Sequence, residues 1–253
     1  MIRIETVTRA NAKEAGFYCV QNKKSPGHLA KLKWITDDKN NGINIKIAFD
    51  EQGKQLGFIE YVNSENAWRP VRADNYCFIQ CILVISKEAR SKGVATALLN
   101  ECMNEARQSG KNGVCVICSN GTWMADRTLF EKNGFTLTGR LERFDLLTLQ
   151  FNSSSKLPAF IDWRLKLHQY QGWHLVYADQ CPWHEKSVTD LQQAATDHGL
   201  KIHVHKLLTA AEAQLAPSGF GTFALINDGR LIEDHYISRS RFENILKKES
   251  GIK

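Results

Sequence analysis

The strongest hydrophobic signal in the chain extends from Asn75 to Ile85, a nearly continuous run of apolar, aromatic and β-branched residues. A run of this length predicts a strand that is buried on both faces. A polar connector over 86–90 and a turn of small residues over 91–95 follow it. Apolar residues then recur at helical spacing before a stop signal at Gly110; they are Ala95, Leu98, Leu99, Cys102, Met103 and Ala106. The pattern predicts a strand, a tight turn and a helix.

Shorter patterns on both sides of this unit predict the other elements of residues 1–151. Two strands at 43–49 and 56–62 are expected to form a hairpin, because Asp50-Glu51-Gln52-Gly53 between them is a turn sequence. The remaining expected elements are a strand at 2–7, a helix at 28–37, a strand at 113–118, a helix at 124–133 and a terminal hairpin of 135–139 with 143–151.

A polar, serine-rich stretch at 152–158 ends this pattern and is the candidate domain boundary. The segment 152–171 is interpreted as a linker, so the expected domains are 1–151 and 172–253. In the second domain the hydrophobic pattern predicts the order β-α-β-α-β-β-α. Its elements are a strand from 173, a helix ending at His198, a strand at 201–205, a helix capped at Thr209, a hairpin of 220–226 with 230–237, and a helix at 240–248.

The turn before the first long helix is suited to bind an anion. The first amides of a helix have no partner within the helix, and the positive end of the helix dipole points the same way. Gly93 and Ala95 carry little or no side chain, so a phosphate can approach the backbone closely. Arg90 and Lys92 add cationic donors beside it.

The spacing Arg90-x-x-Gly93-x-Ala95 resembles the pyrophosphate loop of the GNAT family of N-acetyltransferases. The segment 129–135, which ends in Gly-Phe, is similar to the helix end that closes the cofactor cleft in that family. The segment 58–62, Trp68-Arg-Pro and Cys81 resemble the YoaP-like branch. The resemblance implies an α/β (α+β) chain: a GNAT acyl-CoA N-acyltransferase fold with a mixed, mostly antiparallel sheet, followed by a smaller thioredoxin-like domain.

The same resemblance implies acetyl-CoA as the cofactor. Its thioester would lie against the end of the central strand, and its pyrophosphate would meet the amides of 92–96. The cofactor-binding residues implied in this way are Leu83, Val84, Ile85, Arg90, Ser91, Lys92, Gly93, Val94, Ala95, Thr96, Ser119, Asn120 and Phe130. Many relatives have a tyrosine at the place of Phe130, where it protonates the leaving thiolate, and phenylalanine cannot do so.

Candidate catalytic residues are Glu60 and Glu65 as bases acting through water, and Cys81 as an acetylated nucleophile. Glu60 lies in an otherwise apolar strand, so it either faces solvent or occupies a cleft with a raised pKa. Cys81 is alternatively a small core residue. Candidate substrate-binding residues are Tyr61, Trp68 and Arg69, although Trp68 can equally be core and Arg69 a partner of Glu65.

In the second domain, Cys181-Pro-Trp-His184 is similar to the Cys-Pro-Tyr-Cys of glutaredoxins, with His184 in place of the resolving cysteine. A thiol before a helix N-terminus and beside a histidine is expected to have a lowered pKa, which would make Cys181 reactive. The alternative is an inert remnant. Without a second thiol a dithiol oxidoreductase is disfavoured. Cys181 and His184 with His203 and His205 form a possible soft-metal set, but we expect no bound metal.

Composition limits the class of protein and its partners. The 253 residues have a net charge of +6 with scattered lysines and arginines, which suits a phosphorylated cofactor and does not indicate nucleic acid. No apolar run approaches a membrane span, and the N-terminus lacks the apolar core of a signal peptide. The seven cysteines have no zinc-knuckle spacing, and several lie within apolar runs. We therefore expect a cytoplasmic protein.

Taken together, these features predict an acetyl-CoA-dependent N-acetyltransferase acting directly on a primary amine of a small molecule or amino acid. The alternatives are a non-catalytic acyl-CoA sensor with an interaction module, and a thiol-redox protein using Cys181. Neither a membrane nor a nucleic acid is expected as a partner, and the chain is expected to be a monomer or a homodimer.

Overall fold

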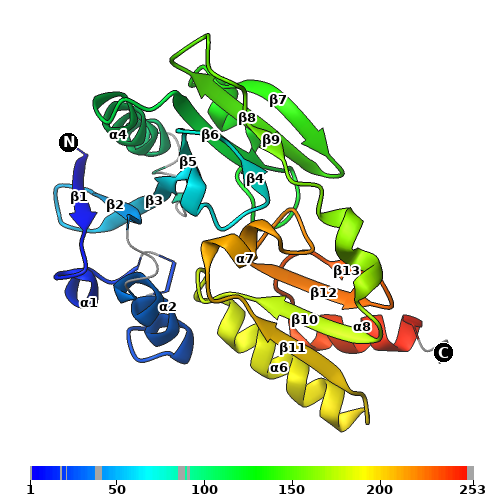
Figure 1. The fold of residues 1–253 in the computed structure, drawn as a ribbon. Helices are drawn as coiled ribbons and strands as arrows, with labels where there is room; N and C mark the ends of the chain where they lie inside the picture. Colours follow the sequence, from blue (N-terminus) through cyan, green and yellow to red (C-terminus); the bar gives the residue numbers. More distant parts are fainter. Residues whose placement is uncertain are drawn as a thin grey trace.

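A computed structural model describes residues 2–17, 19–20, 22–37, 42–84, 89 and 92–249. Its N-terminal part is built on one seven-stranded sheet in the order β1-β2-β3-β5-β6-β8-β7 (Figure 1). Every neighbouring pair in this sheet is antiparallel except β5 with β6, which is parallel. The strands are β1 (Arg3–Val7), β2 (Asn44–Phe49), β3 (Gln55–Asn63), β5 (Cys77–Val84), β6 (Gly113–Cys118), β7 (Thr136–Leu141) and β8 (Phe144–Gln150).

Helices cover both faces of this sheet. The helices of this part are α1 (Ala12–Ala15), α2 (Pro26–Thr36), α4 (Val94–Gln108) and α5 (Arg127–Glu131). Side chains of the central strands point to both faces: Ile59 and Ile79 pack with α4, whereas Phe58 and Cys81 pack on the side of α2. Ile79 and Cys81 lie on opposite faces because a bulge in the β3–β5 pair inserts Gln80 between them. The predicted strands and the long central helix are confirmed, and the helix expected at 124–133 is shorter, with Asp126 capping it.

The C-terminal part contains a four-stranded sheet in the order β11-β10-β12-β13, with β10 and β11 parallel and the other pairs antiparallel. The predicted order of elements is confirmed, while the likeness to the thioredoxin fold stays a prediction. The elements are β10 (Trp173–Tyr177), α6 (His184–Asp197), β11 (Ile202–Lys206), α7 (Ala210–Gln214), β12 (Phe223–Asn227), β13 (Arg230–Glu233) and α8 (Arg239–Glu249).

The segment between the two parts is packed rather than extended. Its short strand β9 (Ala159–Phe160) pairs with β4 (Val71–Arg72), and a 3₁₀ helix, η3 (Trp163–Gln169), follows. Trp163 is buried against Phe144 and belongs to a hydrophobic cluster that continues into the C-terminal part. The polar sequence at 152–158 suggests a linker, but the residues that follow it join the two parts through one shared core.

The turn before α6 lies directly on α2. A methyl group built on Gly27 would come within 1.9 Å of the carbonyl oxygen of Pro182, so only glycine permits this approach. The C-terminal part therefore covers the α2 side of the large sheet, as Figure 1 shows. In the part of the chain that the structure describes, no helix combines the length and apolar character that a membrane span requires.

Candidate active site at the domain junction

Strands β5 and β6 separate after a short paired stretch. Their pairing covers Cys77–Ile79 of β5 and ends with Ile79 opposite Val116. Strand β5 nevertheless continues to Val84, and β6 continues to Cys118. On the β6 side, the main-chain groups of β5 beyond Ile79 thus have no described strand partner. Leu83 and Val84, which were predicted to face the thioester, lie on this diverging segment.

The N-terminus of α4 follows this segment, and a left-handed glycine opens it. Gly93 has φ 73°, and no atom lies within 4 Å of the position where its Cβ would be. At this end the Ala97 amide donates to the Gly93 carbonyl, and no side chain among the described residues caps the helix. The amides of Val94, Ala95 and Thr96 are therefore available for an anion, with the exposed Lys92 beside them.

The other predicted cofactor residues are divided between surface, core and undescribed positions. Ile85, Arg90 and Ser91 lie outside the described residues. Asn120 is exposed, and the buried Ser119 hydroxyl accepts hydrogen bonds from Arg143 (2.9 Å) and from the Gly121 amide (3.1 Å). Phe130 is fully buried and packs edge-on against Phe135. Its assignment to the cofactor surface is wrong, because a side chain enclosed in the core has no free face.

A buried ion pair crosses the domain junction at Glu60. The Glu60 carboxylate accepts hydrogen bonds from Lys31 Nζ on α2 (2.5 Å) and from the Gln180 side-chain amide (2.8 Å). Lys31 also donates to the main-chain carbonyl of Gln180 at 2.6 Å. Lys31 and Glu60 are 3% and 1% exposed. The carboxylate is thus neither exposed to solvent nor unpaired. Its hydrogen bonds join three segments, namely β3, α2 and the turn before α6.

Tyr61 and the pair Trp68-Arg69 have structural partners rather than a free acceptor surface. Tyr61 faces α4 and donates its hydroxyl to Glu105, on the opposite face from Glu60. Trp68 is buried and packs edge-on against Trp34. Arg69 donates to the carbonyls of Phe220 (2.6 Å) and Gln80 (3.3 Å), so the expected partner Glu65 is wrong. Trp68 and Arg69 are therefore part of the domain contact, whereas Tyr61 packs against α4.

Glu65 lies on the surface in a short 3₁₀ turn, η2 (Ser64–Asn66). Its carboxylate accepts from the Asn75 amide at 2.8 Å, and its carbonyl accepts from Gln214 of α7 at 3.0 Å. These contacts hold the turn that leads into β5.

Cys81 is the cross-strand partner of Glu60, and Cys181 directly follows Gln180. Burial raises the pKa of each of these thiols to about 12; the Glu60 carboxylate raises the pKa of Cys81 further, and Cys81 and Glu60 raise that of Cys181. The Cys19 thiol belongs to the same group, and burial raises its pKa to about 12 as well. The expected lowering at Cys181 is therefore wrong, because desolvation outweighs the favourable position before a helix. All three thiols are protonated at neutral pH.

His184 is buried and uncharged. Its Nδ1–H donates to the Ala178 carbonyl at 2.8 Å, while its Nε2 has no hydrogen-bond partner among the described residues. Burial lowers its pKa to about 4, and the nearby Arg69 and Lys31 act in the same direction. A neutral imidazole does not stabilise a thiolate, which is a second reason why Cys181 is not activated.

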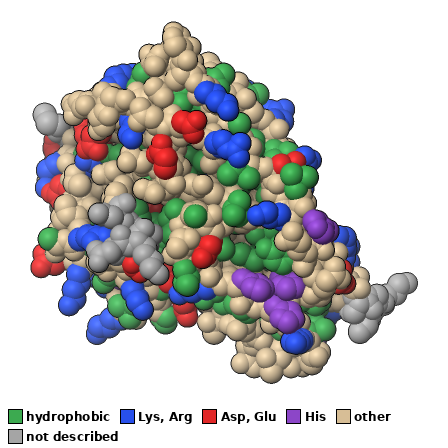
Figure 2. All heavy atoms as spheres, in the orientation of Figure 1, with side chains coloured by type: hydrophobic (Ala, Val, Ile, Leu, Met, Phe, Trp, Pro, Cys, Tyr) green, Lys and Arg blue, Asp and Glu red, His purple; other side chains and the backbone are tan. Residues whose placement is uncertain are grey.

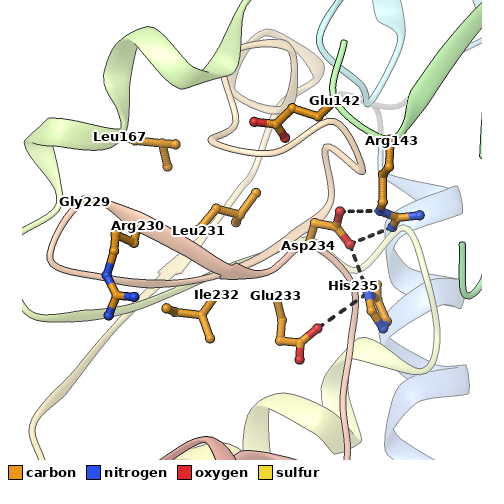
Figure 3. Close-up of a pocket in the computed structure, with 10 residues that line it drawn as sticks. All are labelled: Glu142, Arg143, Leu167, Gly229, Arg230, Leu231, Ile232, Glu233, Asp234 and His235. Atoms are coloured by element: carbon orange, nitrogen blue, oxygen red, sulfur yellow. Dashed lines mark hydrogen bonds and ion pairs between the residues drawn. The ribbon is translucent and has the colours of Figure 1, made fainter. Parts of the chain in front are cut away.

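A second ion pair joins the two parts on another side of the junction. Arg143, just before β8, donates two hydrogen bonds to Asp234 at 2.6 Å each, and His235 donates to the same carboxylate at 2.9 Å (Figure 3). Burial alone would raise the pKa of Asp234, but the bonds from His235 and Arg143 lower it overall. The pair borders a cavity of about 470 Å³ that β13 and the turn before β8 line.

The exposed face of β10 and β11 carries three adjacent histidines, visible as a patch in Figure 2. The rings of His203 and His205 lie 4.9 and 5.1 Å from that of His174, whose Nδ1 is 2.9 Å from His205 Nε2. The buried His184 instead contacts Ala178, Phe220, Phe223 and Tyr236. Among the described residues, no group of three metal-binding side chains has the geometry to hold a metal ion.

Sequence reasoning missed Lys31, Gln180, Arg143 and Asp234. Lys31 interrupts the apolar face of the predicted helix at 28–37, three residues before Trp34. A charge on an apolar helix face is the one feature of the sequence that indicates a buried, paired lysine. Nothing in the sequence pairs it with Gln180, which is 149 residues away.

Replacing Lys31 by methionine should leave the Glu60 charge buried without its counterion. We expect Lys31→Met to lower the free energy of unfolding by about 3–5 kcal/mol, measured by denaturant titration. Lys31→Met with Glu60→Leu should recover much of this loss, because both charges are then removed. Lys186→Met, which breaks the exposed pair with Asp190, should cost less than about 1 kcal/mol. A Lys31→Met protein as stable as Lys186→Met would contradict the assignment.

The buried His184 should make the protein less stable in mild acid. Between pH 6.5 and about 4 the unfolded chain binds a proton at this residue that the folded chain does not, so stability falls as pH falls through this window. The total effect is on the order of 3 kcal/mol. His184→Gln should flatten the stability curve between pH 7 and 4, and the exposed His168→Gln should leave it unchanged. An unaltered slope in His184→Gln would refute the buried neutral state.

Two family models and a relative are similar to this chain. Residues 42–137 match the acetyltransferase (GNAT) domain model, and residues 201–244 match the YoaP-like model. The chain is 28% identical over 247 residues to the uncharacterized N-acetyltransferase YoaP of Bacillus subtilis (strain 168), an alignment that covers 95% of this chain and 96% of the relative.

Solved structures of acetyltransferases are similar to the N-terminal part. The PaiA N-acetyltransferase from Thermoplasma acidophilum in complex with coenzyme A is 18% identical, with a TM-score of 0.42 over 60% of this chain and 99% of that one. The spermidine/spermine N-acetyltransferase SpeG from Vibrio cholerae is 14% identical, with a TM-score of 0.40 over 59% and 95%. The family-model matches and the YoaP relative therefore identify a GNAT acetyltransferase domain followed by a YoaP-like domain, and the protein is an acetyl-CoA-dependent N-acetyltransferase.

Proposed function

We propose that this enzyme transfers an acetyl group directly to a primary amine of a small molecule or amino acid that enters from the α2 side of the sheet. The observation that carries the proposal is the separation of β5 from β6 beside the open N-terminus of α4. Acetyl-CoA supplies the activated acetyl group. Both features use main-chain atoms, so they do not depend on the side chains that vary around them.

On the donor side, the residues that would hold acetyl-CoA are Leu83 and Val84 of β5 and the amides of 94–96. The freely exposed Gly93 lets an anion approach these amides, and Lys92 supplies a positive charge. Phe130 supplies no proton to the departing thiolate. A thiol with a pKa of about 8.5 is a tolerable leaving group at neutral pH without an acid.

On the acceptor side, Glu60 and Cys81 are cross-strand partners that share the α2 face. A thiol whose pKa is about 12 is a poor nucleophile at neutral pH, which supports direct transfer over an acetylated Cys81. The candidate bases Glu60 and Glu65 would act through water, because Lys31 and Gln180 engage the Glu60 carboxylate and the Asn75 amide engages that of Glu65. Lys31 and Gln180 fix the position of the Glu60 carboxylate.

The placement of the pyrophosphate can be tested with two glycines of the same helix. Gly93→Glu should weaken CoA binding at least a hundredfold, because a carboxylate then occupies the anion site. Gly110→Glu is the matched control, since Gly110 also has a positive φ (64°) and open space but lies beyond the other end of α4. We expect it to bind CoA as the wild type does. Calorimetric titration with CoA measures both, and equal affinities in the two variants would overturn the placement.

The reaction itself is tested by the release of CoA from acetyl-CoA across a panel of primary amines, followed with a thiol reagent. We expect release above the rate of hydrolysis for at least one amine, and its loss in Gly93→Glu but not in Gly110→Glu. Hydrolysis alone with every amine would contradict transfer to a small amine.

A further inference from the structure

Three aromatic side chains from separate segments line a cleft of about 640 Å³ between the two parts of the molecule. Trp123 comes from the loop between β6 and α5, Trp183 from the turn before α6, and Tyr236 from the segment between β13 and α8. The Tyr236 ring stacks on Trp123 with centroids 4.6 Å apart. Trp183 is nearly parallel to Tyr236, at 9° and 6.4 Å. A cleft of this size at a domain junction is suited to a small ligand.

Both tryptophans of the cleft are open to solvent, and the backbone of Trp123 is strained. Trp123 is 59% exposed and Trp183 is 44% exposed. Trp123 also has φ 65°, a left-handed conformation that a bulky side chain rarely adopts. A strained backbone that presents a large exposed ring is typical of a binding position rather than of a packing position.

Tyr236 connects this cleft with the interior of the junction. Its ring lies 5.8 Å from that of His184, whose Nε2 is an acceptor without a partner among the described residues. Burial raises the pKa of Tyr236, and the thiols of Cys181, Cys19 and Cys81 lie close enough to raise it further. The cleft therefore borders the buried junction at Tyr236, and its Trp123 lies in the loop that follows the end of β6 where β6 separates from β5.

The charges at the rim of the cleft are neutralised in pairs. Lys186 contacts Asp190 at 2.6 Å, and Arg241 contacts Glu233 at 2.8 Å. An unpaired cluster of carboxylates, which would favour a polycation, is not found among the residues that line the cleft. Recognition by stacking on aromatic faces is therefore favoured over recognition by charge.

We propose that this cleft binds the acceptor of the transferase, and that the acceptor is a primary amine attached to a planar aromatic ring. The ring lies against Trp123 and Trp183, and the amine points past Tyr236 toward the junction. That the ligand of this cleft is the acceptor rests on the function proposed above. The YoaP-like domain then supplies part of the acceptor site, through Trp183 and Tyr236.

The test compares 2-phenylethylamine with 2-cyclohexylethylamine, which differ in the planarity of the ring and not in the amine. Binding to the full chain is measured by calorimetry without acetyl-CoA. We expect the aromatic amine to bind at least tenfold more tightly than the saturated one. Trp123→Leu and Trp183→Leu should each weaken its binding at least fivefold, while Leu165→Ala, which removes an exposed apolar side chain outside the cleft, should leave it unchanged.

Four outcomes would overturn the proposal. Three concern the amines: no binding of 2-phenylethylamine, equal affinity for the two amines, or wild-type affinity in both tryptophan variants. A loss of CoA affinity in Trp123→Leu would also overturn it, because the cleft would then belong to the nucleotide. These outcomes are separate from the proposed reaction. Binding of the aromatic amine without CoA release would support the cleft as a binding site and contradict the proposed reaction. CoA release that is unchanged in both tryptophan variants would support the reaction and contradict the cleft as the acceptor site.

Discussion

The buried carboxylate of Glu60 is the constraint on which the domain arrangement depends. A charge removed from water must be paired and hydrogen-bonded, and no residue of β3 itself supplies such a partner. Lys31 of α2 and Gln180 of the turn before α6 supply the partners. The Gln180 side-chain amide donates to Glu60, and its main-chain carbonyl accepts from Lys31. Moving the YoaP-like domain away would remove bonds from both charged groups at once. The ion pair thus makes the relative placement of the two domains specific.

The same contact explains the state of the thiols around it. Cys19, Cys81 and Cys181 come from three distant segments and meet where the C-terminal domain covers the sheet. Closure of the junction excludes water, and desolvation then raises each thiol pKa more strongly than a helix end or a neighbouring cation lowers it. A motif that resembles a redox centre is therefore held in its protonated form, and its turn instead serves as a docking surface for α2.

The donor and acceptor sides of this enzyme rest on different kinds of contact. The proposed donor side would use main-chain amides and the gap between β5 and β6, which follow from backbone geometry alone. The proposed acceptor side would use side chains contributed by both domains, from Glu60 to Trp123 and Trp183. In this proposal the acetyltransferase domain is combined with an acceptor surface that depends on the attached domain.

The sequence alone determined the elements, because they depend on local periodicity, and the anion site predicted at the turn before α4 stays a prediction. The run at 75–85, the helix after Gly93 and the order of strands and helices in the C-terminal part were all predicted and are present. Phe130, Tyr61 and Cys181 were misjudged for one physical reason: burial and strand face are set by residues far away in the chain. A one-residue step along a strand moves a side chain to the other face, so Tyr61 faces α4 while Glu60 faces α2. Only the tertiary structure could bring Lys31, Glu60 and Gln180 together, because pairing across 149 residues depends on how the domains pack and leaves no periodic signal.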